Sequence, residues 1–134
     1  MNQLISYNIY EFQDSLVICG SCLPNMDKQA FDKLQQISNK IFYVCLEEIH
    51  MNIVAHKIAS ILRVGKVKTL IFASVDGSPH CVQLHYIRNE LEKIMNLKNI
   101  KLVNYVSNNG DLVEVSKDTI SLSKKLAEIQ RLKK

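Results

Sequence analysis

The sequence lacks tryptophan, long hydrophobic runs and abundant glycine or proline: its 134 residues include four glycines and two prolines. No apolar stretch approaches the roughly 20 residues that span a bilayer, which argues against a membrane-spanning helix. The first twelve residues, MNQLISYNIYEF, have no basic start followed by an apolar stretch, so they do not resemble a secretory signal. We therefore expect a cytoplasmic protein without a membrane partner. With no linker or repeat, residues 1–134 are expected to form one domain.

Several functional motifs are also missing. No GxGxxG, Walker loop or GxSxG is legible, and neither a second CxxC nor an HxxxH accompanies the single CxxC. The net charge of +4 does not indicate nucleic acid, because basic and aromatic residues are not interleaved. Much of the basic excess lies late in the last predicted helix, where it complements the helix dipole. We expect no nucleic-acid partner.

Short apolar segments alternate with amphipathic ones along the chain. Three segments, 15–19, 41–45 and 67–75, are typical of buried parallel strands, and 100–106 alternates as a strand nearer an edge does. The turn at 107–111 followed by 112–115 suggests an antiparallel edge hairpin. Residues 1–12 fit either an edge strand or an irregular arm.

Helical apolar stripes lie between the strands. They cover 30–37, 51–62 and 84–94, and a last helix follows Ser116 and carries Leu122, Leu126 and Ile129. Strictly alternating strands and helices predict a three-layer α/β sandwich around a mainly parallel sheet of four or five strands. We expect the strand order 2-1-3-4, as in flavodoxin-like or Rossmann-like folds.

The four cysteines all fall at the carboxyl ends of predicted strands. Cys19 and Cys22 form CGSC after the first strand, Cys45 ends the second, and Cys81 follows the third. Without an export signal, disulfides are not expected. The carboxyl edge of an open α/β sheet is where ligands bind, so a shared site is one interpretation. Inert buried thiols are the other.

The segment SVDGSPHC, residues 74–81, combines a loop with a helix start. Ser78 is a suitable N-cap and Pro79 a suitable first helical residue, so Cys81 falls in the first turn, where the dipole favours a thiolate. We therefore expect Cys81 to be the most reactive thiol. His80 adjoins it, and His85 one turn later is expected to face it. A capped helix with a small residue in its first turn is the alternative interpretation.

These residues resemble those of a known family. CGSC, the single Cys45 and SVDGSPHCVQLHY are similar in order to the delta (iron–sulfur) subunit of methyl-viologen-reducing hydrogenases, over roughly residues 15–95. The resemblance implies a [2Fe–2S] cluster held by Cys19, Cys22, Cys45 and Cys81, and electron transfer with a larger oxidoreductase subunit. The chain departs from that pattern at Asp76, where the family has another cysteine.

Three hypotheses follow. The leading one is a cytoplasmic redox accessory or electron-transfer protein whose four cysteines bind an Fe–S cluster or zinc. The second is a phosphate- or nucleotide-binding module in which Asp76, Gly77 and Ser78 cradle the ligand at a helix N-terminus. The third is a small enzyme with Cys81 as nucleophile and His80 or His85 as base. The sequence leaves open whether the protein is an enzyme.

Overall fold

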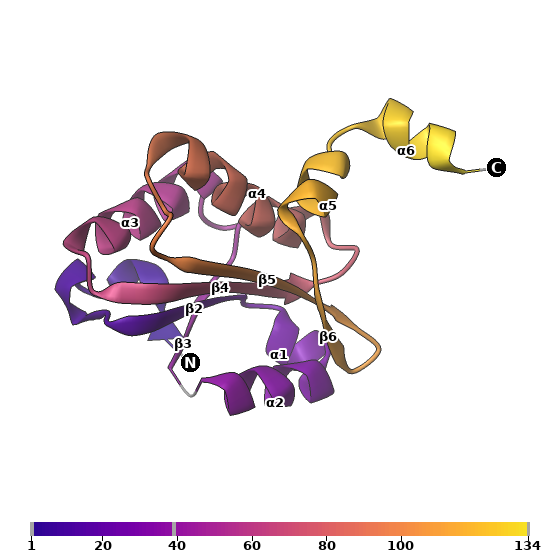
Figure 1. Cartoon of the computed structure of the whole chain (residues 1–134). Coiled ribbons are helices and arrows are strands. Elements are labelled where there is room, and N and C mark those ends of the chain that lie inside the picture. Colours follow the sequence, from indigo (N-terminus) through magenta and orange to yellow (C-terminus); the bar gives the residue numbers. More distant parts are fainter. Residues whose placement is uncertain (1, 39, 134) are drawn as a thin grey trace.

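A computed structural model describes residues 2–38 and 40–133. Within these residues the strands form one sheet in the order β1-β3-β2-β4-β5-β6 (Figure 1). Neighbouring strands from β1 to β5 are parallel, and β6 pairs antiparallel with β5. The strands are β1 (Asn2–Gln3), β2 (Asp14–Gly20), β3 (Ile41–Val44), β4 (Val67–Val75), β5 (Lys101–Asn108) and β6 (Asp111–Glu114).

The predicted fold class is confirmed. The four strands expected from the sequence correspond to β2, β3, β4 and β5, and they have the predicted order, since β3-β2-β4-β5 is 2-1-3-4. The antiparallel hairpin is present as β5 and β6. The N-terminal segment is the edge strand β1, followed by short 3-10 turns at Leu4–Ser6 and Ile9–Glu11.

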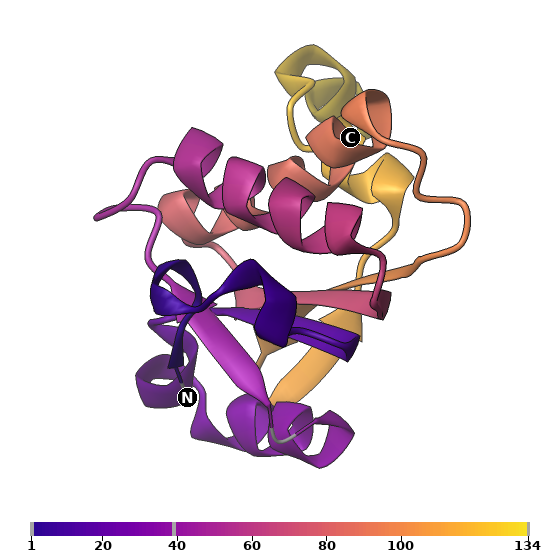
Figure 2. The same ribbon diagram turned by 90° about the vertical axis from the view of Figure 1, so that its left-hand side faces the viewer.

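Helices cover both faces of the sheet. Figure 2 shows α3 and α4 on one face and α1 with α2 on the other. No helix in the described part of the chain is long and apolar enough to cross a membrane. The helices are α1 (Leu23–Met26), α2 (Lys28–Ile37), α3 (Met51–Val64), α4 (Pro79–Ile94), α5 (Lys117–Leu122) and α6 (Leu126–Leu132).

Two apolar cores lie on the two faces of the sheet. Alternate residues of β2 enter different cores: Leu16 and Ile18 pack beneath α3 and α4, whereas Val17 and Cys19 pack with residues of α1 and α2. This is the two-residue period of a strand. The same alternation decides which side chains near the end of β2 face which helices.

One carboxylate joins the start of α2 to the tip of the β5–β6 hairpin. Asp27 caps α2 by accepting a hydrogen bond from the Ala30 amide at 3.1 Å, and it also accepts one from the Gly110 amide at 3.0 Å. Gly110 has a φ of +89°, and a Cβ there would overlap the side chain of Gln29. Glycine is therefore required at the hairpin tip.

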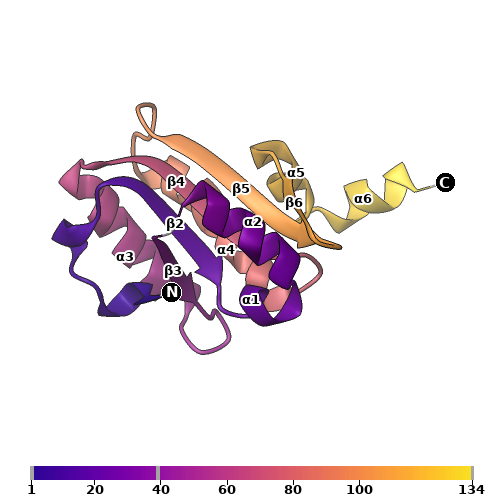
Figure 3. The same cartoon turned by 90° about the horizontal axis from the view of Figure 1, so that it is seen from below.

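The C-terminal region differs from the single helix predicted from the apolar spacing. The helix is interrupted after α5, where Ser123 Oγ donates to the Ile120 carbonyl at 2.6 Å and lies 3.3 Å from the Tyr86 hydroxyl. A serine that binds nearby backbone and a neighbouring helix competes with helix continuation. As a result, α6 projects from the body of the domain (Figures 1 and 3).

Candidate functional site

Three of the four cysteines line one hollow at the carboxyl edge of the sheet. We call this hollow the thiol pocket; it has a volume of about 90 Å³ and is lined by Cys22, Cys45 and Cys81, together with Glu47, Ser78 and His80. The cysteines come from three segments that are distant in sequence. Parallel strands bring these segments together, because their carboxyl ends meet at the same edge.

Each thiol is placed by the end of a different element. Cys22 is exposed and occupies the N-cap position of α1, directly after β2. Cys45 follows the last residue of β3 and begins a turn in which its carbonyl accepts from the Glu48 and Ile49 amides, at 3.1 and 2.9 Å. Cys81 is the third residue of α4 and is 8% exposed.

The helix start that carries Cys81 has the predicted form. Ser78 caps α4, and its Oγ accepts a hydrogen bond from the Cys81 amide at 3.3 Å. Gly20, the last residue of β2, leaves room for the thiol: a Cβ at Gly20 would lie 3.2 Å from Cys81 Sγ. The missing side chain at Gly20 thus allows the thiol to sit against the strand.

Cys19 does not line the thiol pocket. It is fully buried in the core beneath α1 and α2, and its Sγ donates to the Gly20 carbonyl at 3.2 Å. Burial, and secondarily the nearby Cys81 thiol, raises the pKa of Cys19 to about 12. The predicted set of four metal ligands is therefore divided by the strand alternation, and Cys19 is not available to the thiol pocket in this structure.

The thiol pocket disfavours negative charge on Cys22. Burial raises the pKa of the Cys22 thiol, and so do the neighbouring Cys81, Cys45 and Glu47, while a hydrogen bond from Ser21 opposes them. None of the described residues that line this pocket is a lysine or arginine. A bound cation would reverse this effect, because it would attract the thiolates that otherwise repel one another.

The two histidines of α4 have different surroundings. His80 is exposed and lines the thiol pocket. His85, one turn after Cys81, has both ring nitrogens occupied by partners on the sheet. It is 2% exposed, its Nε2 lies 2.6 Å from Ser74 Oγ, and its Nδ1 lies 2.8 Å from Asn104 Nδ2. Partners on β4 and β5 therefore direct the imidazole toward the sheet.

We call Ser74, His85 and Asn104 the polar network. The Asn104 amide donates to His85 Nδ1, so Nε2 carries the proton and donates to Ser74. Burial, with a smaller contribution from Arg88, lowers the pKa of His85 to about 4, which keeps the imidazole neutral. Sequence reasoning missed this network; its one signal is Asn104, a polar residue within an otherwise apolar segment.

The three loop residues proposed to cradle a phosphate are not gathered into one site. Ser78 lines the thiol pocket and uses its hydroxyl as a helix cap. Asp76 is exposed and lines a different hollow, beside Asp27 and Asn108. Gly77 turns the chain between them, with a φ of +84°. Glu47 in the thiol pocket further disfavours an anionic ligand there.

Among residues 2–38 and 40–133, no three histidine, cysteine or acidic side chains are placed so that they could hold a metal ion without rearrangement. The thiol pocket nevertheless contains residue types that bind metals in other proteins. Three thiols and the imidazole of His80 are the ligand types of a Cys₃His zinc site. A cluster held by four cysteine thiolates does not fit, because Cys19 would have to leave the core.

The fold agrees with a family comparison. The topology is that of an open α/β domain with its hollow at the carboxyl edge. A family model described as a Rossmann-like domain matches residues 12–134, and the chain belongs to this family. No curated protein and no solved structure matches the chain.

Proposed function

We propose that the chain binds a thiophilic metal ion through Cys22, Cys45 and Cys81 and acts as a metal-binding accessory protein. The observation that carries this proposal is the convergence of three thiols from three distant segments on one hollow. A hollow with three thiols, an acidic Glu47 and no basic lining residue among those described suits a soft cation better than a phosphate.

The four side chains would have separate roles in binding the metal ion. Cys22 lies at the N-cap of α1 and Cys45 begins a turn, so their thiols would rotate toward the hollow, whereas Cys81 is held by α4 and Gly20. His80 would supply a fourth donor. A bound metal would supply a redox or Lewis-acid centre. The resemblance noted in the sequence supports a role beside a larger oxidoreductase subunit.

Cobalt substitution tests the proposal directly. Anaerobically reduced protein is titrated with Co²⁺, whose thiolate charge-transfer bands report sulfur ligands, and Zn²⁺ is then used to displace it. We expect such bands with wild-type protein. Cys22→Ala, Cys45→Ala and Cys81→Ala should each weaken binding at least about a hundredfold, more than the loss of an indirect partner of the metal.

Cys19→Ala is the matched control. This variant removes a thiol of the same chain that lies outside the thiol pocket, so it should retain the charge-transfer bands and the affinity. Absence of thiolate bands in the wild-type titration would refute the proposal. Equal losses for all four cysteine variants would refute the three-thiol assignment. Iron and acid-labile sulfide in protein purified without oxygen would instead support a cluster.

A further inference from the structure

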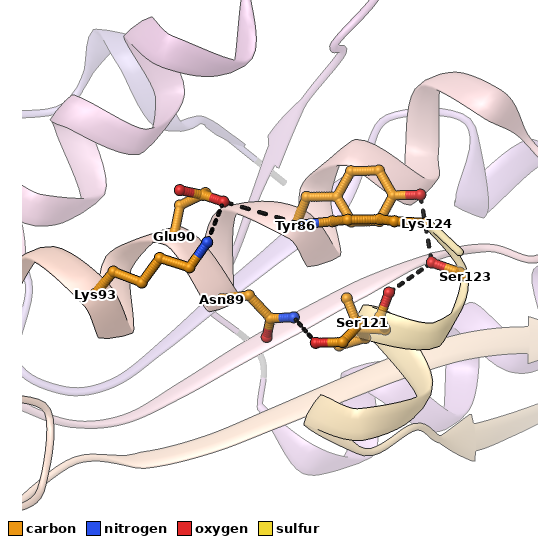
Figure 4. Close-up of polar contacts among 8 residues, drawn as sticks. Tyr86, Asn89, Glu90, Lys93, Ser121, Ser123 and Lys124 are labelled. Carbon is orange, nitrogen blue, oxygen red and sulfur yellow. Dashed lines mark hydrogen bonds and ion pairs between the residues drawn. The ribbon is translucent and has the colours of Figure 1, made fainter. Parts of the chain in front are cut away.

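The base of α6, where the chain enters this helix, is held against α4. Ser121 and Ser123, at the end of α5 and just after it, bind α4: Asn89 Nδ2 donates to Ser121 Oγ at 3.1 Å, and Ser123 Oγ lies 3.3 Å from the Tyr86 hydroxyl (Figure 4). Lys124 Nζ lies 4.6 Å above the Tyr86 ring and 3.9 Å from Glu90. The chain therefore leaves the domain in a defined direction.

Beyond this fixed base, α6 presents apolar side chains to solvent. Leu126 is 77% exposed and Leu132 is 69% exposed, with Ile129 between them on the helix. Lys125, Arg131 and Lys133 lie at the ends of the helix and outnumber its one acidic residue, Glu128. Among the described residues, the ion pairs found for residues 117–133 involve Lys117 and Lys124 alone. An apolar stripe flanked by unpaired positive charge is suited to an acidic, hollowed surface.

The chain has such a surface at the loop between β3 and α3. The thiol pocket lies on one side of Cys45, rimmed by Glu47, and a second hollow of about 250 Å³ lies on the other, rimmed by Glu48. Apolar side chains line both hollows, with Leu46 in the first and Ile5 and Ile49 in the second. We call this surface, formed by the two hollows with Glu47 and Glu48, the acidic edge.

Within one copy, α6 and the acidic edge lie on different sides of the domain, as Figures 2 and 3 both show for α6 and the β3–α3 loop. However, α6 extends beyond the end of the sheet at which β4 and β5 finish (Figures 1 and 3). Two copies that meet at these ends would each bring α6 to the other's acidic edge. The complementary charges favour this pairing, whereas α6 against α6 would bring positive charges together.

We propose that α6 of one copy docks on the acidic edge of a second copy and partly covers its thiol pocket, in a reciprocal dimer. The apolar stripe of α6 would enter the hollows beside Cys45, and its basic residues would pair with Glu47 and Glu48. The contact is small, so the dimer would be weak and would form in a concentration-dependent manner. This inference does not depend on what the thiol pocket binds.

Sedimentation velocity on reduced, metal-free protein over a wide range of concentrations tests the dimer. We expect wild-type protein to dimerise and Leu126→Asp to remain monomeric. Ile94→Asp is the matched control, because Ile94 is equally prominent, at 74% exposed, but lies at the end of α4. Glu47→Lys combined with Glu48→Lys should weaken dimerisation at least about tenfold, whereas Glu11→Lys with Glu114→Lys should not.

Mixing the two defective proteins makes the assignment specific. Leu126→Asp retains the acidic edge, and the Glu47→Lys, Glu48→Lys protein retains α6, so a mixed pair keeps one of the two reciprocal contacts. The mixture should therefore dimerise more strongly than either variant alone and more weakly than wild-type protein. The proposal would be overturned if wild-type protein stayed monomeric. It would also be overturned if neither Leu126→Asp nor Glu47→Lys with Glu48→Lys weakened the dimer. Binding of monomers to phosphatidylserine vesicles through α6 would overturn it as well. Co²⁺ binding by the Leu126→Asp monomer tests the metal proposal separately.

Discussion

The thiol pocket and the polar network both include residues of α4, one turn apart, but their polar groups have opposite surroundings. In the polar network, His85 has a partner for each ring nitrogen and all three side chains are buried. In the thiol pocket, three thiols and Glu47 line open space, and burial together with Cys81, Cys45 and Glu47 raises the pKa of Cys22. Buried side chains that bind one another stabilise the position of a helix, whereas in the thiol pocket the neighbouring thiols and carboxylate disfavour further negative charge.

The largest expected effect distinguishes the thiol pocket from Cys19. With a pKa of about 12, Cys19 has a thiolate fraction roughly a thousandfold below that of an ordinary thiol at neutral pH, and it is fully buried. We expect Cys22 to react first with iodoacetamide, because it is exposed and Cys81 is not. This revises the sequence-based ranking of Cys81. Site-resolved mass spectrometry measures the alkylation rates. Equal rates for Cys19 and Cys22 would contradict the placement of Cys19 outside the thiol pocket.

The next largest effect concerns the polar network. His85→Ala should lower the free energy of unfolding by about 4 kcal/mol, because it leaves a cavity and strands Ser74 and Asn104 without partners. Urea denaturation provides the measurement. His80→Ala is the control on the same helix and should change the free energy by less than about 0.5 kcal/mol, since His80 is exposed. Similar losses of unfolding free energy for the two variants would show that the polar network stabilises the protein no more than the exposed His80 does.

Acid should weaken the same network. The pKa of His85 is about 4 in the folded protein, below the ordinary value of 6.5, so between these pH values the unfolded chain binds a proton that the native state does not. The stabilisation is complete above about pH 6.5 and is lost progressively down to about pH 4, by about 3 kcal/mol in total. His85→Asn should flatten this part of the pH–stability curve. An unchanged curve would mean that other groups cause the acid sensitivity.

A smaller effect tests how the thiol pocket is built. Gly20→Ala places a Cβ against Cys81 Sγ, and the thiol must move by a few tenths of an ångström. We expect a coupling of about 1 kcal/mol between Gly20→Ala and Cys81→Ala in a double-mutant cycle, because the clash disappears when the sulfur is removed. Gly20→Ala with Cys45→Ala is the matched cycle and should show additive effects. Additivity in both cycles would show that Gly20 does not position Cys81.

The sequence was sufficient to predict the sheet order and the edge at which the cysteines gather. Buried apolar segments alternating with helical stripes leave few topologies, and carboxyl ends of parallel strands share one edge. It was not sufficient to divide the cysteines. Cys19 lies one residue before the end of β2. The face of the sheet to which its side chain points depends on the pairing register, and a strand predicted to end at Cys19 did not determine that register.

Other features that the sequence did not reveal also depend on residues that are distant in the chain. The spacing of Cys81 and His85 places both on one face of α4, but it could not identify Ser74 and Asn104 as the partners of the imidazole. Similarly, the apolar period through Leu122, Leu126 and Ile129 predicted one helix. Contacts of Ser123 with Tyr86 on α4 interrupt it, and local sequence carries no trace of that partner.

Asp27 takes part in two contacts that differ greatly in sequence separation, which has a consequence for the order of folding. Its bond to Ala30 closes a loop of one helical turn, whereas its bond to Gly110 joins residues 83 apart. Local contacts form early because they cost little chain entropy, and distant ones wait until the intervening chain is arranged. One carboxylate would thus help to start α2 and later secure the β5–β6 hairpin. Replacing it should slow the refolding of the chain and also hasten its unfolding.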